Sequence, residues 1–138
     1  MSDRSVSPAT LRVLTELDHV RIGRCLAAGA HPAVQRLLDD ADVVPSDAVD
    51  PDVVTMRSRV RVCDPDQADG GLRELTLVYP DEADAARGQV SVLSPVGAAL
   101  LGLRAGALAR WTQPDGRAAA LRVQAVTFQP EACGELLR

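Results

Sequence analysis

Lysine is absent from this sequence, and all fifteen of its basic residues are arginines. An enzyme that uses a lysine nucleophile or a lysine Schiff base is therefore excluded. Aromatic residues are nearly as scarce, since Trp111, Tyr79 and Phe128 together make up 2% of the chain. So few aromatic side chains leave little for stacking on bases, which argues against a protein that binds single-stranded nucleic acid in this way.

The three cysteines, Cys25, Cys63 and Cys133, lie far apart and form no C-x-x-C motif. An odd number of thiols does not suggest a disulfide framework. Neither His19 nor His31 stands at a metal-ligand spacing from a cysteine. We interpret the cysteines as small apolar residues in a reducing compartment, and we expect neither a metal ion nor another cofactor.

Long apolar runs and an excess of basic residues are also missing. No stretch approaches the roughly 20 apolar residues of a membrane-spanning helix, and the N-terminus does not resemble a secretion signal. The net charge of −4 and the pI near 5.1 argue against a broad basic surface for nucleic-acid phosphates. We expect a cytoplasmic protein that does not bind specific nucleic-acid sequences directly.

The chain does contain enough apolar side chains for a core. Hydrophobic residues make up 46% of 138 residues, which suffices for one domain, with or without a small appendage. The most informative stretch begins with Gln89–Leu93, where apolar and polar residues alternate as in a strand. Ser94 and Pro95 follow in the order of a helix N-cap and a first helical residue. We predict a short helix, Pro95–Leu101, which Gly102 ends.

The N-terminal part has helical patterns. Thr15 is a candidate N-cap, with Asp18 in the first turn, for a helix that runs from Glu16 to about Ala28. A second helix is predicted over Pro32–Val44, because its apolar residues recur with helical spacing. The short link between the two helices predicts an antiparallel helical hairpin over residues 1–44.

A proline- and aspartate-rich linker, residues 45–51, separates this hairpin from the strand patterns that follow. We therefore place a domain boundary there, with the second domain at residues 52–138. Because the linker should carry few core contacts, we expect the second domain to fold without residues 1–44.

Four segments of the second domain have strand patterns besides Gln89–Leu93. Val53–Cys63 alternates over its whole length, and Leu72–Tyr79 is predicted as its antiparallel return strand. Ala107–Thr112 and Arg117–Phe128 are predicted as a final hairpin, which turns at Pro114–Gly116. Five strands and one short helix indicate a compact α+β domain.

Five sequence blocks carry a resemblance to a known family. They are Asp52–Met56, Ser58–Val60, Thr76–Pro80, Ser94–Leu103 and Gln129–Ala132. With these blocks in this order, the chain resembles the GreA/GreB transcript cleavage factors, and among them the branch called regulators of nucleoside diphosphate kinase (Rnk). The resemblance is specific over the C-terminal two thirds and looser before it.

The resemblance implies a fold and a partner. Its C-terminal domain is similar to the FKBP fold, a twisted antiparallel sheet around a short helix. In the family, the corresponding corner docks on a coiled coil at the rim of the RNA polymerase secondary channel. This makes Leu93, Ser94, Pro95 and Val96 candidate partner-binding residues. Leu93 stands where some Gre proteins have an acidic residue. The alternative for Ser94 is a helix cap alone, and both roles can hold at once.

The resemblance also implies two activities that the residues do not support. Gre factors place an Asp and a Glu at the tip of a long hairpin, whereas the predicted tip here, Ala27–Pro32, contains no carboxylate. The acids Asp39, Asp40 and Asp42 lie at the far end of the second arm, so we expect them to be solvated. Prolyl isomerisation, the other activity of the FKBP fold, needs an aromatic pocket that three scattered aromatics do not provide. We expect no catalytic residues.

Three arginines, Arg57, Arg59 and Arg61, alternate along the predicted strand Val53–Cys63. On one strand face their side chains would stand about 6.6 Å apart, a spacing that suits phosphates or an acidic protein surface. The alternative is that they pair with Glu74 and other acids of the return strand, and we favour this pairing. The arginines are a possible secondary basic face for a partner.

These observations favour a regulator that binds RNA polymerase near its secondary channel. It would compete with or modulate Gre factors and influence nucleoside diphosphate kinase levels, without catalysis of its own. One alternative is a degenerate Gre factor that still stimulates cleavage. Another is a binding module for a different protein. The oligomeric state is left open.

Overall fold

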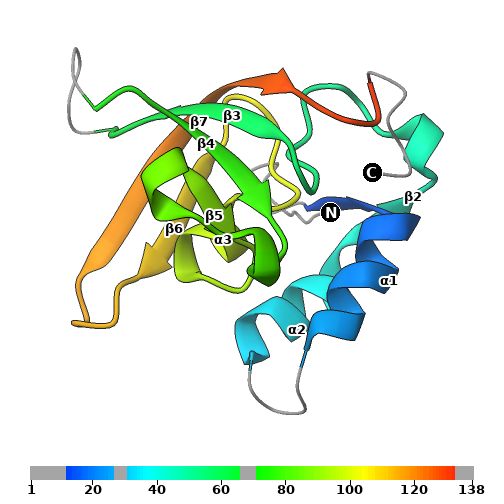
Figure 1. Cartoon of the computed structure of the whole chain (residues 1–138), viewed down its shortest axis with the longest axis horizontal. Helices are drawn as coiled ribbons and strands as arrows, with labels where there is room; N and C mark the ends of the chain where they lie inside the picture. Colours follow the sequence, from blue (N-terminus) through cyan, green and yellow to red (C-terminus); the bar gives the residue numbers. More distant parts are fainter. Residues whose placement is uncertain (1–11, 27–30, 66–70, 133–138) are drawn as a thin grey trace, which may run out of the picture.

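The computed structural model describes residues 12–26, 31–65 and 71–132, and it has a mixed α/β architecture with few helices. Figure 1 shows a curled sheet that surrounds one short helix, with two further helices packed to one side. The sheet has five strands in the order β5-β4-β3-β7-β6. Their bounds are β3 Arg59–Cys63, β4 Arg73–Val78, β5 Gln89–Ser91, β6 Leu108–Thr112 and β7 Ala118–Phe128.

The sheet is mixed, so the prediction of a wholly antiparallel sheet is wrong. The pairs β3–β4, β3–β7 and β6–β7 are antiparallel, whereas β4 and β5 run parallel. A parallel pair needs a connection that carries the chain back to the start of the first strand. Two short 3-10 turns, η3 Pro80–Glu82 and η4 Ala85–Arg87, make that return between β4 and β5.

The helices of the N-terminal part are shorter than predicted. Helix α1 is Glu16–Cys25 and helix α2 is Pro32–Asp40, and they lie side by side in Figure 1. Residues 42–44 are not helical: β2 Asp42–Val44 pairs in parallel with β1 Val13–Thr15. Successive β-branched residues favour a strand there, and tertiary pairing overrides the helical spacing. Of the predicted tip, residues 27–30 lie outside the described residues.

The long strand predicted over Val53–Cys63 is also shorter, because its first half is a turn. Val53 makes only an isolated bridge to Arg104, and Arg57 has a positive φ of 65°. The Ser58 amide donates to the Thr55 carbonyl, and the Thr55 amide donates to Ser58 Oγ at 2.9 Å. Thr55 is buried in this turn, although in a continuous strand it would lie on the same face as the exposed Arg59 and Arg61.

The hydrophobic core is one cluster that both parts of the chain share. Helix α3, Pro95–Leu100, lies inside the curled sheet, and its Leu100 is fully buried. Four side chains of the N-terminal part belong to the same cluster: Leu14, Ile22, Val34 and Leu38. The α1–α2 unit therefore packs against the same core as α3 and the sheet. The division into two domains at residues 45–51 stays a prediction.

Candidate partner-binding site

The predicted partner-binding residues form a corner between β5 and α3, which we call the Ser94 corner (Leu93, Ser94, Pro95 and Val96). Ser94 is the N-cap of α3: its Oγ accepts from the Gly97 amide at 3.1 Å. The same hydroxyl donates to the Ser91 carbonyl at 2.6 Å. The predicted N-cap is confirmed, and the hydroxyl proton is used as well.

The apolar residues of the corner are left on the surface. Pro95 is exposed, and Leu93 and Val96 are half-buried. Helix α3 packs tightly on β5, because a Cβ atom added to Gly97 would lie only 2.8 Å from the Ser91 carbonyl carbon. Only glycine permits α3 to approach β5 this closely. The corner thus presents a partly apolar surface in which the Ser94 hydroxyl is already hydrogen-bonded.

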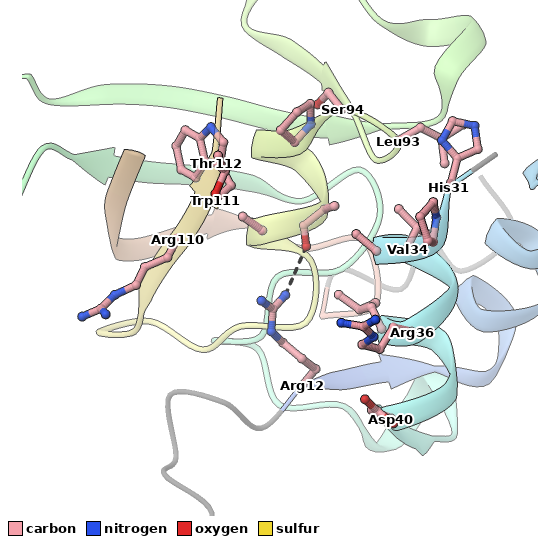
Figure 2. Close-up of a pocket in the computed structure, with 16 residues that line it drawn as sticks. Arg12, His31, Val34, Arg36, Asp40, Leu93, Ser94, Arg110, Trp111 and Thr112 are labelled. Atoms are coloured by element: carbon pink, nitrogen blue, oxygen red, sulfur yellow. Dashed lines mark hydrogen bonds between the residues drawn. The ribbon is translucent and has the colours of Figure 1, made fainter. Parts of the chain in front are cut away.

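Beside the corner lies a groove of about 660 Å³, shown in Figure 2. One wall comes from α2 and the residue before it, and the other comes from α3, β6 and the corner itself. Leu93, Ser94 and Pro95 line this groove, whereas Val96 does not. The sequence could not indicate the groove, because its walls are about sixty residues apart and no motif spans both.

Arg12 lines the groove and is hydrogen-bonded to the end of α3. Its Nη1 donates to the carbonyl of Leu101 at 2.7 Å and to that of Ala98 at 3.2 Å. These carbonyls lie at the C-terminal end of α3, where backbone acceptors lack helical partners and a cation is favoured. Burial lowers the pKa of Arg12 below its ordinary value. Arg12 therefore joins the N-terminal part to the helix that carries the corner.

The three arginines proposed as a secondary face do not share one strand face. Arg57 lies in the turn before β3, where its guanidinium binds Glu82 through two bonds, Nη2 to Oε2 at 2.8 Å and Nε to Oε1 at 3.2 Å. This pairing raises the pKa of Arg57 and lowers that of Glu82. The guanidinium also lies 5.5 Å from the centre of the Tyr79 ring.

The other two arginines are on β3, as predicted. Arg59 lies 3.9 Å from Glu74 across the strand pair, which agrees with the favoured alternative. Arg61 is exposed and stands directly opposite Glu74 in the register. Each of the three arginines therefore has an acidic neighbour. Arg57 has a positive φ and does not share the strand face of Arg59 and Arg61.

Three of the matched sequence blocks meet at a largely buried polar group that we call the Asp18 cluster (Asp18, Thr55, Ser58 and Glu131). Asp18 Oδ2 accepts from the Met56 amide at 3.0 Å. Thr55 Oγ1 donates to Glu131 Oε1 at 2.7 Å and contacts Ser58 Oγ at 2.8 Å. Asp18 lies in the first turn of α1, as predicted, and it is also buried and connects α1 to the segment before β3.

The carboxyl group of Asp18 has a raised pKa of about 6. Burial is the main cause, and the charge of Glu131 adds to it. The hydrogen bonds from Met56 and Thr15 and the charge of Arg21 act in the opposite direction. In residues 12–26, 31–65 and 71–132, no group of three or more His, Cys, Asp or Glu side chains could hold a metal ion.

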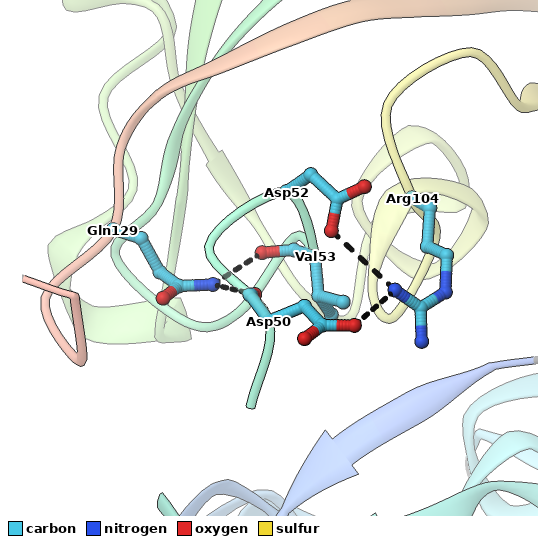
Figure 3. A network of polar contacts seen from close by, with 5 residues as sticks. All are labelled: Asp50, Asp52, Val53, Arg104 and Gln129. Atoms are coloured by element: carbon cyan, nitrogen blue, oxygen red, sulfur yellow. Dashed lines mark hydrogen bonds and ion pairs between the residues drawn. The ribbon is translucent and has the colours of Figure 1, made fainter. Parts of the chain in front are cut away.

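A second group of contacts holds the start of the segment before β3, at residues 50–53, as Figure 3 shows. Gln129 Nε2 donates to the carbonyls of Asp50 and Val53, at 2.8 and 2.9 Å. Arg104 Nη1 lies 2.7 Å from Asp50 Oδ2 and 3.4 Å from Asp52 Oδ1. The matched blocks Asp52–Met56 and Gln129–Ala132 are thereby explained as parts of one structural contact.

Comparison with known proteins gives consistent matches over most of the chain. Residues 49–128 match the family described as "Transcription elongation factor, GreA/GreB, C-term". The chain is 40% identical over 131 residues to "Regulator of nucleoside diphosphate kinase" of Escherichia coli K12, covering 91% of this chain and 95% of that protein. It is 41% identical over 76 residues to "Transcription elongation factor GreA" of Nitratidesulfovibrio vulgaris, which is 55% of this chain and 46% of that protein.

A solved structure is similar over nearly its whole length. It is "Prokaryotic transcription elongation factor GreA/GreB from Nitrosomonas europaea", with a TM-score of 0.70 and 35% sequence identity. The match covers 86% of this chain and 98% of that one. No helix in the described part of the chain is long and apolar enough to cross a membrane.

Proposed function

The chain belongs to the GreA/GreB family of transcription elongation factors, and we propose that it regulates transcription by binding RNA polymerase at the rim of its secondary channel. It acts there in the cytoplasm as a competitor or modulator of Gre-type factors. Its effect on nucleoside diphosphate kinase, which the name of the Escherichia coli relative suggests, follows from altered transcription.

The observation that carries this proposal is the Ser94 corner. Family resemblance implies that this corner contacts polymerase, and the structure leaves its apolar side chains available for such a contact. Because the Ser94 hydroxyl is used inside the corner, the exposed Pro95 ring and its neighbours supply the contact surface. A tightly packed, partly apolar surface loses little conformational entropy on binding.

We also propose that the protein does not stimulate transcript cleavage. The sequence of the predicted tip, Ala27–Pro32, has no carboxylate that could help to hold a catalytic metal ion. Helix α1 has ten residues and is about 15 Å long at 1.5 Å per residue, so its reach is short. The alternatives are a degenerate factor that retains cleavage, and a module for another protein partner.

Two further parts of the hypothesis concern architecture. We propose that residues 52–138 form a GreA/GreB C-terminal domain of FKBP type. Within residues 1–44, α1 and α2 form a short helical hairpin, and residues 45–51 are the linker. The side-by-side packing of α1 and α2, next to the curled sheet around α3, supports this division.

The deciding experiment mixes the purified protein with core RNA polymerase and separates the complex by size. We expect co-elution at micromolar concentration and displacement by an added GreA protein. A backtracked complex with radiolabelled RNA then tests cleavage, and we expect no shortening above the intrinsic background. Absence of co-elution would favour a different protein partner, and shortened RNA would favour the degenerate cleavage factor.

A further inference from the structure

Strand β6 is the last strand in the order β5-β4-β3-β7-β6, so in the described part of the chain it pairs on one side only. In an antiparallel pair, residues alternate between those whose backbone groups face the partner strand and those whose groups face away. Directly after β6, the Gln113 amide donates to the Arg117 carbonyl at 2.8 Å. Counting back from Gln113, the backbone groups of Leu108, Arg110 and Thr112 face away from β7.

These outward backbone groups have no hydrogen-bond partner within residues 12–26, 31–65 and 71–132. The side chains beside them do not cover the edge, since Arg110 and Thr112 are exposed and Leu108 is half-buried. A row of unpaired N–H and C=O groups is the template to which another extended chain adds. The edge of β6 is therefore able to accept a further strand.

The open edge borders the groove beside the Ser94 corner. Arg110, Trp111 and Thr112 line this groove, and Figure 2 shows β6 across from α2. A chain that lies along β6 would thus have α2 on its other side. The groove gives the added strand room and a second wall.

The charges along this groove are opposite in sign to those of the whole chain. Arg12, Arg36 and Arg110 line it together with a single acid, Asp40, whereas the chain has a net charge of −4. Arg36 and Arg110 are exposed, and within residues 12–26, 31–65 and 71–132 neither of them forms an ion pair. The surface next to the open edge therefore favours an acidic chain.

We propose that an extended, acidic segment of another protein adds to β6 as a sixth strand of the sheet. Its backbone exchanges hydrogen bonds with Leu108, Arg110 and Thr112, and its carboxylates are attracted to Arg110 and, across the groove, to Arg36. In strand addition the backbone bonds supply affinity and the side chains supply specificity. This site goes beyond the proposed function and does not depend on binding to RNA polymerase.

A second copy of this chain fits the edge less well than an acidic segment does. The antiparallel register that uses all the outward residues of two β6 strands would place the two Arg110 side chains directly opposite each other. Like charges in such a cross-strand pair are destabilising. The β6 sequence, LARWT, contains no acid that could compensate them.

The first test uses the fluorescence of Trp111, the single tryptophan of the chain, which lies on β6 and lines the groove. The protein is titrated with two short synthetic peptides of alternating residues, Glu with Val in one and Lys with Val in the other. We expect a saturable emission change with the Glu peptide alone. An equal response to both peptides, or none to the Glu peptide, overturns the proposal.

The second test asks whether the peptide pairs with the backbone of β6. Thr112→Pro removes an outward amide, which an edge strand tolerates, and Thr112→Ala is the matched control that keeps it. Affinity for the Glu peptide should fall about fivefold or more in the proline variant and stay within about twofold in the alanine variant. Circular dichroism melting checks that both are folded. Equal affinity in two folded variants would overturn strand pairing.

A version of the Glu peptide with methylated backbone amides tests the same pairing on the wild-type protein, so the result does not depend on a variant that folds. We expect its binding to be lost, and unchanged binding would contradict the proposal. A dimer of the wild-type protein that Thr112→Pro converts to a monomer, measured by sedimentation, would assign the edge to a second copy instead.

The third test concerns charge. The double variant Arg36→Glu/Arg110→Glu should bind the Glu peptide about tenfold or more weakly. The control Arg24→Glu/Arg87→Glu changes the net charge equally at exposed positions outside the groove and should stay within about twofold. Equal loss in both would show an effect of net charge alone and overturn the assignment of the site.

The peptide titration also separates this proposal from polymerase binding. Val96 does not line the groove, so Val96→Glu should bind the Glu peptide within about twofold of wild type. If the wild-type protein does not bind polymerase but binds the Glu peptide through β6, the proposed function fails and the strand site stands. Polymerase binding without a response to the Glu peptide gives the reverse result.

Discussion

The Ser94 corner and the Asp18 cluster differ in where their polar groups are satisfied. In the corner, Ser94 bonds to residues three positions away on either side, and Pro95 is exposed while Leu93 and Val96 are half-buried. In the cluster, Asp18 bonds to Met56 and Thr55 bonds to Glu131, so each contact joins distant parts of the chain. The first region is a surface built by local contacts, and the second is an internal connection.

This difference separates binding from stability, although blocks matched to the family contribute to both regions. Substitutions in the Asp18 cluster should change the free energy of unfolding and leave polymerase affinity unchanged. Substitutions on the exposed side of the corner should do the reverse. Four experiments test this contrast, beginning with the largest expected effect.

Removal of residues 1–44 tests the internal connection as a whole. The remaining chain should keep a cooperative thermal transition, in agreement with the proposed domain division. Its free energy of unfolding should fall by about 3 to 6 kcal/mol, because the core loses the side chains packed on it and the α3 carbonyls lose Arg12. Calorimetry measures both quantities. A chain without a cooperative transition would show that the two parts form one domain.

Asp18→Asn should stabilise the protein at neutral pH. The pKa of Asp18 is raised from 3.8 to about 6 in the folded state, so the native state favours the protonated carboxyl group. The resulting stability is fully present below pH 3.8 and is lost as the pH rises through 6. Each pKa unit corresponds to about 1.4 kcal/mol, which makes the loss about 3 kcal/mol.

Asn is neutral at every pH and its side-chain oxygen can still accept from the Met56 amide. The stability difference between variant and wild type should therefore grow between pH 4 and pH 6 and stay constant above about pH 7. Urea denaturation across this range measures it, and polymerase affinity should not change. An Asn variant that is less stable at pH 7.5 would mean that the cluster requires the charged carboxylate.

Val96→Glu tests the half-buried apolar part of the corner. A carboxylate here would be desolvated without a partner when polymerase binds, so affinity should fall about tenfold or more. The first turn of a helix tolerates an acid well, and the melting temperature should change little. Affinity and melting are measured on the same preparation. Unchanged affinity in a folded variant would make the corner purely structural and move attention to the face of Arg59 and Arg61.

Ser94→Ala should have the smallest effect and the opposite profile. Loss of the cap to Gly97 should cost about 1 kcal/mol of stability, while most of the contact surface remains. A melting curve and a polymerase titration together distinguish this variant from Val96→Glu. A large loss of affinity with an unchanged melting temperature would assign the hydroxyl to the interface.

Predictions that depended on local backbone chemistry were the most accurate. The Ser94 cap and the start of α3 at Pro95 are confirmed. Gly102 and Gly116 have φ values of 82° and 91°, which few other residues adopt without strain, and both stand where turns were predicted. The Thr15 cap of α1 is confirmed as well. In each case the residue type limits its own φ or satisfies a nearby amide.

Predictions that extended a periodic pattern over many residues were less accurate. The helix predicted from spacing over Pro32–Val44 includes the observed strand Asp42–Val44. The strand predicted from alternation over Val53–Cys63 includes the observed turn at Arg57. Periodicity shows which side chains are buried but not which backbone partner is present. That partner is β1 in the first case and, in the second, β4, whose Leu77 carbonyl accepts from the Arg57 amide.

The sequence by itself determined the family, the short capped helix and the exposed corner that follows β5, because these depend on neighbouring residues and on matched blocks. Only the tertiary structure decided that β4 and β5 run parallel, that Asp18 is buried, and that Arg36 and Arg110 stand on opposite sides of one groove. Each of these depends on which distant segments meet when the core closes. A side chain's spacing from its sequence neighbours contains no information about such a meeting.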